Sequence, residues 1–463
     1  MIKHIKIVMA EVAAGAGIAL AAEEVLSTTL QAGVATYFLT KPTQPLSATF
    51  TRIAVAHDDE LHKRSLIRSN HTLTIIDSKA YIFGGETADG EVASNDMHVV
   101  NLAPGEDQVW EYQLIPALAN DEGGRVPRGR TNHAACTFEG GVVVYGGTSS
   151  TGQPADDGAV WLYNPSEKSW SILYSFASDG PVLRQETEVR IFASASCLIL
   201  LIGTPTDGIS TISKLTPSLS SEATSTPSAY ETLVPPPAPT SPSNASFYNN
   251  HLYLISSTDP ISSQLHILAV DSKDPKWTTL NFPTNPLAPG PRARHAGALL
   301  PITTGYGRNY LVYLLGERSE HTATAARSTS ATFAEQKLSS ITSDKESEPP
   351  EEPTQWSDTW TLQLPSSDLS PQAKLNIKDA IKPAKIKDAI RSGVGANSGK
   401  WAWAEVEVRV PDDLGDAGAG KLHPGPRAFF GADVMQDGKS VVFWGGSDAE
   451  GEKVGDGWVV RLE

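Results

Sequence analysis

The chain has little cysteine and little positive charge. Only two of its 463 residues are cysteines, which excludes a disulfide scaffold and a cysteine-based metal site and fits a reducing compartment such as the cytoplasm. Lysine and arginine number 37 against 53 aspartates and glutamates, so the formal net charge is −16. Because an acidic chain repels the phosphate backbone, nucleic acid is not expected as the main partner.

The chain also lacks an apolar run long enough to cross a membrane. In the Ala-rich N-terminal region the longest charge-free stretches, residues 12–22 and 25–40, contain 11 and 16 residues, whereas a spanning helix needs roughly 20. No transmembrane span is therefore expected. Residues 10–35 are predicted to form a helix that covers the protein's own surface, within an N-terminal extension over residues 1–47.

Two other interpretations of the N-terminal region remain open. A helix over residues 9–40 could instead make peripheral contact with a membrane surface or with a partner. Alternatively, residues 1–22 combine a basic start with an apolar segment, as a signal peptide does. In that case the protein would be secreted rather than cytoplasmic.

Internal repetition is the strongest signal in the sequence. Two segments share one order: Arg-x-x-His, an apolar strand, Gly-Gly, a loop, Asp, a second apolar strand and a late Trp. Their second glycines, Gly85 and Gly147, are 62 residues apart, and further copies, weakest in the third and fourth, bring the total to six. The glycines that mark the copies are Gly84, Gly85, Gly146, Gly147, Gly203, Gly316, Gly445 and Gly446, and the late tryptophans are Trp110, Trp170, Trp277 and Trp403.

Each copy predicts a small antiparallel sheet of four strands. Runs of β-branched and aromatic residues alternate with Gly, Asn, Asp and Pro, and the glycine doublet allows positive φ and close backbone packing. One such sheet cannot bury both of its faces, whereas sheets repeated radially pack on one another. The predicted fold is therefore all-β, a six-bladed β-propeller over residues 48–463.

The doublets, the downstream Asp and the late Trp resemble kelch repeats. The whole chain is similar to stand-alone fungal kelch and galactose-oxidase-like propellers, and this resemblance implies that the outermost strand of a blade carries the Trp. The last copy has no such outer strand, while the alternating segment Ala48–Val55 belongs to no copy. We therefore expect this N-terminal segment to complete blade six and to close the ring.

Three segments interrupt the blade pattern. Residues 216–244 are rich in Ser, Thr and Pro, residues 317–354 have few apolar side chains and an acidic end, and residues 366–400 contain a repeated Ile-Lys-Asp-Ala-Ile sequence. All three are predicted to be disordered or irregular inserts in the propeller.

The sequence shows no motif for catalysis, a metal or a cofactor. Galactose-oxidase-like copper chemistry would require a Tyr crosslinked to a Cys and two His ligands, but Cys136 and Cys197 lie in apolar runs predicted as buried inner strands. The Glu-x-x-x-Asp-x-x-x-His pattern of iron-dependent specifier proteins is absent, as are common hydrolase and phosphate-binding motifs. No cofactor is therefore expected.

The recurring Arg-x-x-His motif allows two interpretations. Its residues are Arg68 with His71, Arg130 with His133, Arg292 with His295, and Arg427 with Phe430, and Arg294 is a neighbouring alternative. The arginines would be structural if they bond loop carbonyls or an Asp inside each blade. They would bind a partner if they form a cationic ring at one mouth of the channel, suited to carboxylate or phosphate groups; similar kelch receptors hold acidic peptides with such arginines.

The predicted function is a non-catalytic scaffold of the kelch-repeat type that binds a protein or an acidic peptide. One alternative is an enzyme whose site lies at the propeller mouth, either metal-dependent or specifier- or isomerase-like, because a propeller mouth can host chemistry that no motif reveals. A second alternative is a membrane-peripheral adaptor that acts through the N-terminal helix.

Overall fold

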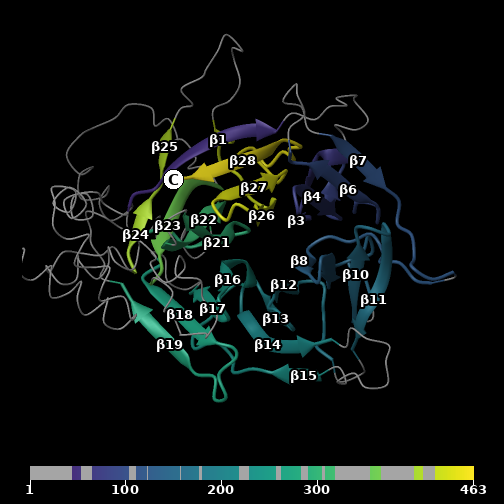
Figure 1. Cartoon of the computed structure of the whole chain (residues 1–463), viewed down its shortest axis with the longest axis horizontal. Helices are drawn as coiled ribbons and strands as arrows, with labels where there is room; N and C mark the ends of the chain where they lie inside the picture. The colour runs from purple at the N-terminus through teal and green to yellow at the C-terminus, as the bar shows by residue number, and fades with distance from the viewer. Residues whose placement is uncertain are drawn as a thin grey trace, which may run out of the picture.

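A computed structural model of the chain describes most of the repeat region (Figure 1). The described residues are 44–53, 65–103, 111–122, 124–156, 158–176, 180–217, 229–256, 262–282, 290–304, 308–318, 355–365, 401–409 and 423–463. The predicted N-terminal helix, Trp110 and most of the three predicted inserts lie outside these residues.

Six of the described sheets are blades arranged around a common centre, so the predicted six-bladed propeller is confirmed (Figure 1), and a seventh sheet pairs only the short β2 (Arg68–Ser69) and β5 (Glu86–Thr87). Blade one has β3 (Thr72–Ile76), β4 (Lys79–Phe83), β6 (Met97–Asn101) and β7 (Tyr112–Ile115). Blade two has β8 (Ala134–Phe138), β9 (Gly141–Tyr145), β10 (Ala159–Asn164) and β11 (Ser169–Ser175). Blade three has β12 (Glu188–Ala193), β13 (Leu198–Thr204), β14 (Gly208–Thr216) and β15 (Ala229–Thr232).

The second half of the ring repeats this plan. Blade four has β16 (Ala245–Tyr248), β17 (His251–Ile255), β18 (Gln264–Ala269) and β19 (Trp277–Asn281), preceded by the 3-10 turn η1 (Pro242–Asn244). Blade five has β21 (Ala298–Thr304), β22 (Arg308–Arg318), β23 (Gln355–Gln363) and β24 (Trp403–Glu405), and the short β20 (Arg294–His295) pairs with the end of β22. Blade six has β26 (Gly431–Val434), β27 (Ser440–Trp444) and β28 (Gly457–Leu462) from the C-terminal part of the chain.

The weak third and fourth copies fold as complete four-stranded blades. Strand β15 lies inside residues 216–244, which the sequence predicted as an irregular insert, and β22 extends to Arg318, inside the predicted insert 317–354. The three late tryptophans that the structure describes all lie on fourth strands, as expected: Trp170 on β11, Trp277 on β19 and Trp403 on β24. Both insert boundaries are therefore corrected to shorter segments.

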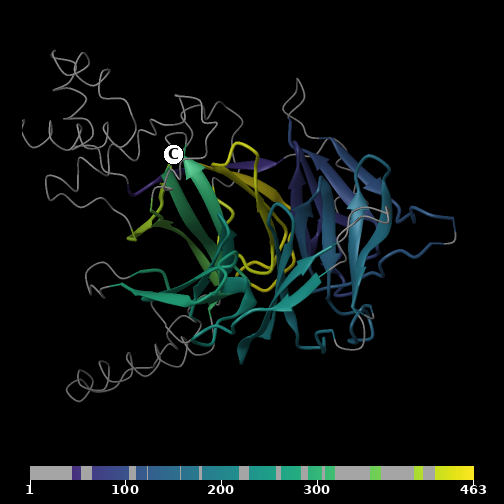
Figure 2. The same cartoon turned by 60° about the horizontal axis from the view of Figure 1, so that its bottom comes forward.

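The N-terminal strand closes the ring, as predicted. β1 (Ser47–Ile53) pairs antiparallel with β28, and Phe50 lies opposite Val460. The backbones of Ser47 and Glu463 exchange two hydrogen bonds of 3.0 and 2.9 Å. In the tilted view of Figure 2, the yellow strands of blade six lie between the green strands of blade five and the blue strands of blade one.

A fifth strand strengthens this closure, which the sequence did not predict. β25 (Glu407–Arg409) runs parallel to β1 and follows directly on β24, the outer strand of blade five. Val406, between the two strands, is buried, and its amide donates to the Thr359 carbonyl of blade five at 2.8 Å. The next amide, of Glu407, donates to the Leu46 carbonyl at 2.9 Å. One continuous segment therefore joins the outer edges of blades five and six.

The core lies between neighbouring blades. The residues of each apolar cluster come from adjacent sheets; one cluster joins Leu200 of blade three to Tyr145 of blade two, and another joins Ile199 to Leu252 of blade four. Cys136 lies on the inner strand β8, as predicted, whereas Cys197 immediately precedes β13, the second strand of its blade. Both cysteines are free.

Candidate functional site

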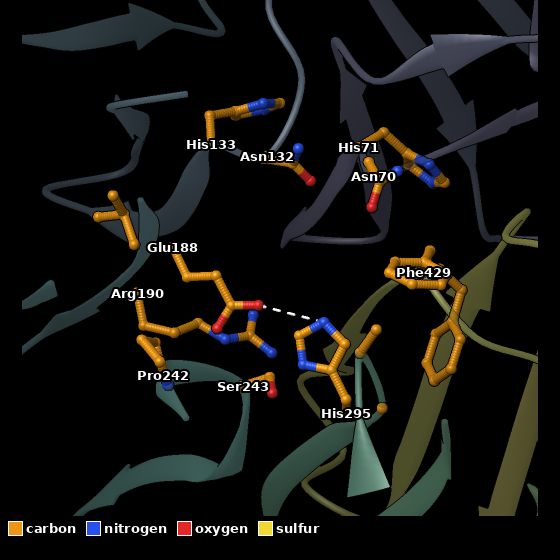
Figure 3. Close-up of a pocket in the computed structure, with 14 residues that line it drawn as sticks. Asn70, His71, Asn132, His133, Glu188, Arg190, Pro242, Ser243, His295 and Phe429 are labelled. Atoms are coloured by element: carbon orange, nitrogen blue, oxygen red, sulfur yellow. Dashed lines mark ion pairs between the residues drawn. The ribbon is translucent and has the colours of Figure 1, made fainter. Parts of the chain in front are cut away.

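All six blades contribute to a pocket at one mouth of the central channel (Figure 3). The pocket is formed by the segments that lead into the six inner strands, and its volume is about 130 Å³. The lining residues are Asn70, His71, Asn132, His133, Glu188, Val189, Arg190, Pro242, Ser243, His295, Ala296, Gly297, Phe429 and Phe430. Since pockets for organic cofactors are usually larger than about 300 Å³, this space suits one or two side chains of a partner.

A ring of left-handed residues holds four of these segments together. Asn70, Asn132, Ala296 and Phe429 have φ values of 55°, 56°, 50° and 59°. The amide of Phe429 donates to Ala296 at 2.9 Å, that of Asn70 to Phe429 at 2.8 Å, and that of Asn132 to Asn70 at 3.1 Å. Blades five, six, one and two are thus linked in order around the mouth.

Two residues before each left-handed residue lies a buried arginine. Arg68, Arg130, Arg294 and Arg427 are each no more than 2% exposed. Their guanidinium groups donate to the carbonyls of Gly84, Gly146, Leu315 and Gly445 at distances of 2.9, 2.9, 3.0 and 3.3 Å. Each acceptor is the first of the two residues at the doublet position of its blade (Leu315 takes the place of the glycine in blade five). Each arginine side chain therefore holds the doublet of its own blade in place.

The backbone of the same arginines fixes the preceding blade. The carbonyl of Arg130 accepts from the amide of Gly85 at 2.8 Å, and the carbonyl of Arg68 accepts from Gly446 at 2.8 Å. This approach explains the first glycine of these two doublets, because a Cβ on Gly84 would lie 2.4 Å from the Arg130 carbonyl and a Cβ on Gly445 would lie 2.5 Å from the Arg68 carbonyl. Gly203 differs, since it lies in β13 without a positive φ and instead allows close contact with the Gly208 carbonyl.

Three of the arginines are also paired with a partly buried carboxylate. Arg130 bonds Asp156, Arg294 bonds Asp358 at 3.0 Å, and Arg427 bonds Asp456 at 2.6 Å. Each of these aspartates also accepts from an indole N–H, of Trp161, Trp360 and Trp458 respectively, at 2.7 to 2.8 Å. The structure therefore places these guanidinium groups inside the blades, in the structural arrangement that the sequence left open.

Blade one departs from this pattern. Arg68 donates to the Ser65 carbonyl, and its Nη2 lies 2.8 Å from Nε2 of His98, whose Nδ1 lies 2.8 Å from the hydroxyl of Tyr112. Burial lowers the pKa of Arg68 to about 10, whereas the electrostatic interactions with Tyr112 and Asp96 raise it and offset part of this shift. In the strand register His98 stands where blades two, five and six have Trp161, Trp360 and Trp458. Its ring nitrogen contacts the arginine that an aspartate bonds in those blades.

The positions of the left-handed residues show which arginine of blade five is equivalent to Arg68 and Arg130. The residue equivalent to Arg68 and Arg130 is Arg294, two positions before Ala296, and not Arg292. Arg292 is exposed, and His295 follows the buried arginine directly. The sequence alignment of this copy was therefore two residues out of register.

His71 and His133 lie at the mouth but carry no charge near neutral pH. Burial, and to a smaller extent the charge of Arg68, lowers the pKa of His71 to about 3, while the Trp444 backbone weakly opposes the shift. The same two causes, burial and the neighbouring Arg130, lower the pKa of His133. Among the described residues neither ring nitrogen of His71 has a hydrogen-bond partner of normal geometry.

The change His71→Phe is expected to flatten the dependence of stability on pH. Because the folded-state pKa of His71 lies below its usual value of 6.5, the unfolded chain binds more protons, and stability falls as pH drops from about 6.5 toward 3. Between pH 7 and pH 5, His71 should lower the free energy of unfolding by about 2 kcal/mol. Phenylalanine, which blade six has at the equivalent position 430, does not titrate and should cause no such loss. Urea unfolding at both pH values measures the difference, and parallel profiles for the two proteins would contradict it.

Glu188, Arg190 and His295 lie together in the pocket, and two of them, Glu188 and Arg190, are not predicted from the sequence. Glu188 and Arg190 begin the inner strand β12, while His295 belongs to blade five; Nε2 of His295 lies 3.2 Å from Oε1 of Glu188 (Figure 3). The other carboxylate oxygen of Glu188 accepts from the Ser241 hydroxyl at 2.9 Å. Polar residues alternating with Val189, just before an apolar run, were the available signal.

Arg190 is the one residue of this group whose side chain lacks a hydrogen-bond partner among the described residues. Burial lowers the pKa of Arg190, and the nearby charge of Glu188 opposes the shift. Its guanidinium forms no hydrogen bond or ion pair with any residue that the structure describes. An added anion would therefore find free N–H donors and a partly desolvated positive charge here.

The segments around the mouth are basic although the chain is acidic. They contain nine arginines, two glutamates and neither lysine nor aspartate within residues 65–71, 124–133, 180–190, 239–243, 290–297 and 423–430. Four of the arginines are the buried ones described above, and Arg125, Arg128, Arg184 and Arg292 are exposed. Three of the buried arginines are already paired with Asp156, Asp358 and Asp456, so the unpaired positive charge of these segments comes mainly from Arg190 and the exposed arginines. This charge complements an acidic partner.

A metal-binding cluster and a membrane-spanning helix are both absent from the described part of the chain. Among its residues no group of three or more His, Cys, Asp and Glu side chains is arranged to hold a metal ion. Within the same residues, no helix combines the length and the apolar character that spanning a membrane requires.

The chain is similar to several known proteins. A family model described as the KLHDC2/KLHL20/DRC7 Kelch-repeats domain matches residues 70–306, about half of the chain. Kelch domain-containing protein 1 of Homo sapiens is 25% identical over 144 residues, which are 30% of this chain and 32% of that protein. The chain thus spans about a third of the length of this curated relative. The solved structure of YjhT is similar with a TM-score of 0.48 at 15% identity, over 86% of this chain and 97% of that one.

Proposed function

The chain belongs to the KLHDC2/KLHL20/DRC7 Kelch-repeats domain family, and from this premise we propose that it is a non-catalytic scaffold that binds an acidic peptide segment of a protein partner at the channel mouth. The predicted kelch resemblance is confirmed by this match, and kelch propellers typically bind proteins. The observation that carries the proposal is Arg190, a cation without a hydrogen-bond partner among the described residues, in a small pocket shared by all six blades. The peptide would place a carboxylate on this guanidinium.

The residues proposed for contact differ from those expected from the motif. Arg68, Arg130, Arg294 and Arg427 support the fold, because their guanidinium groups are buried and already bonded. Arg190 inside the pocket takes over the role of partner-binding cation, and the exposed Arg292, three residues before the lining residue His295, is a second candidate. The buried four act indirectly, since they hold the left-handed ring that shapes the mouth.

The geometry does not favour a serine nucleophile as a form of the enzymatic alternative. A serine nucleophile must bond the imidazole that removes its proton, but Glu188 lies between Ser241 and His295 and bonds both. The membrane-peripheral alternative concerns residues 9–40, which lie outside the described residues. Binding of a peptide therefore remains the function that the described geometry favours.

Selection from a displayed library of random peptides tests this proposal, because it requires no assumption about which protein is the partner. The wild-type protein is expected to enrich peptides that contain Asp or Glu, and Arg190→Gln is expected to reduce that enrichment at least tenfold, because a buried charge pair loses one member. The change keeps the length of the side chain and removes its charge. Arg409→Gln, on the exposed strand β25 away from the mouth, serves as the control and should behave as wild type.

Two results would overturn the proposal. One is equal enrichment of acidic peptides by wild-type protein and Arg190→Gln, and the other is the absence of any enrichment by wild-type protein. Circular dichroism and the melting temperature of each variant establish beforehand that the propeller is folded.

A further inference from the structure

Phe429 occupies a position that its side chain does not favour. Its φ of 59° lies in the left-handed region, as do those of Asn70, Asn132 and Ala296 at the equivalent positions of other blades. Asparagine tolerates this conformation because its side chain hydrogen-bonds locally, whereas a bulky residue there is an outlier. Strained residues of this kind gather at ligand-binding sites.

The ring of Phe429 is turned toward the pocket instead of into the core. It is half-buried, points toward the space opposite Glu188 and Arg190, and packs edge-on against His295, with the ring centres 5.8 Å apart (Figure 3). The neighbouring Phe430 behaves differently, since it packs beside Phe443 of its own blade at 5.4 Å. The mouth therefore has a polar, charged side and an aromatic side.

From this arrangement we propose that the pocket recognises an acidic residue with an apolar residue next to it, the carboxylate on Arg190 and the apolar side chain against the ring of Phe429. The inference rests on the proposed function and defines its ligand. A volume of about 130 Å³ admits a pair of small or medium side chains. The basic segments around the mouth are opposite in charge to the acidic member of this pair. Because apolar contact with an aromatic ring adds affinity at a desolvated site, Phe429 determines specificity.

The change Phe429→Asn separates this role from a packing role. It installs the residue of blades one and two, which suits the left-handed backbone, so the melting temperature should stay equal or rise by up to about 2 °C. In the same displayed library of random peptides, the wild-type protein should enrich Leu, Ile, Val, Met or Phe directly beside the acidic residue. Phe429→Asn should lower this flanking preference about tenfold and leave the preference for Asp or Glu intact.

Val408→Asn is the matched control, because it removes an exposed apolar side chain from β25 at the outer rim of the propeller. It should preserve both preferences. If Phe429→Asn keeps the flanking preference, or lowers the melting temperature together with all binding, the specificity role is overturned. If acidic enrichment is absent or independent of Arg190, the proposed function fails instead, so the two failures are distinguishable.

Discussion

Arg130→Ala is expected to lower the free energy of unfolding by about 3–5 kcal/mol, the usual effect of breaking a buried ion pair. The guanidinium has no exposed surface, and its partner Asp156 is only 7% exposed. Removal of the side chain would leave that carboxylate with the Trp161 indole as its remaining donor and would free the Gly146 carbonyl. The stranded negative charge, and not the lost contact alone, makes the effect large.

The design for Arg130 includes its own control. Arg128→Ala removes an exposed arginine two residues earlier, and its effect should stay within about 0.5 kcal/mol. Adding Asp156→Asn to Arg130→Ala removes the stranded charge, so the double variant should be less destabilised than the sum of the single variants. Unfolding in guanidinium chloride measures the wild type, the three single variants Arg130→Ala, Asp156→Asn and Arg128→Ala, and the double variant. A loss below about 1 kcal/mol for Arg130→Ala would show that the pair does not hold the blade.

The sequence predicted the fold because its determinants are local and repeated. Doublets such as Gly84-Gly85 mark positions where φ is positive and a neighbouring carbonyl approaches, and a residue type with this constraint is visible in any copy. Ring closure was predictable for a similar reason, since an unassigned strand at one end matched a missing strand at the other. The third and fourth blades were harder to predict, because apolar runs such as Leu198–Thr204 are their main signal.

The candidate site was predicted only in part, since sequence does not show burial depth. The recurrence of Arg68 and Arg130 is visible in the printed residues, but whether a recurring arginine faces solvent or a Gly carbonyl is a property of packing. In blade five two arginines compete for one position, and only the left-handed Ala296 decides for Arg294. Arg190 belongs to no motif, and the ring geometry alone brings it to the mouth.

A disulfide across the closure should give the largest gain in stability. Thr51 on β1 lies opposite Val459 on β28, and 459 − 51 = 408 positions separate them in the sequence. For a closed loop of this length the chain-entropy relation gives about 6 kcal/mol as an upper bound. Thr51 is exposed, whereas Val459 is half-buried and packs against the edge of the apolar cluster between blades six and one, so Val459→Cys shortens one peripheral apolar contact.

The native thiols should not interfere with this cross-link. Burial raises the pKa of Cys136 and of Cys197, so both remain protonated and react slowly. The oxidised double variant should unfold at a higher guanidinium concentration than its reduced form, and each single-cysteine variant should behave as wild type. Failure of the bond to form would contradict the pairing of β1 with β28. A bond that forms without any gain would mean that separation of the two ends is not part of unfolding, and that the ring is held by its blade-to-blade contacts alone.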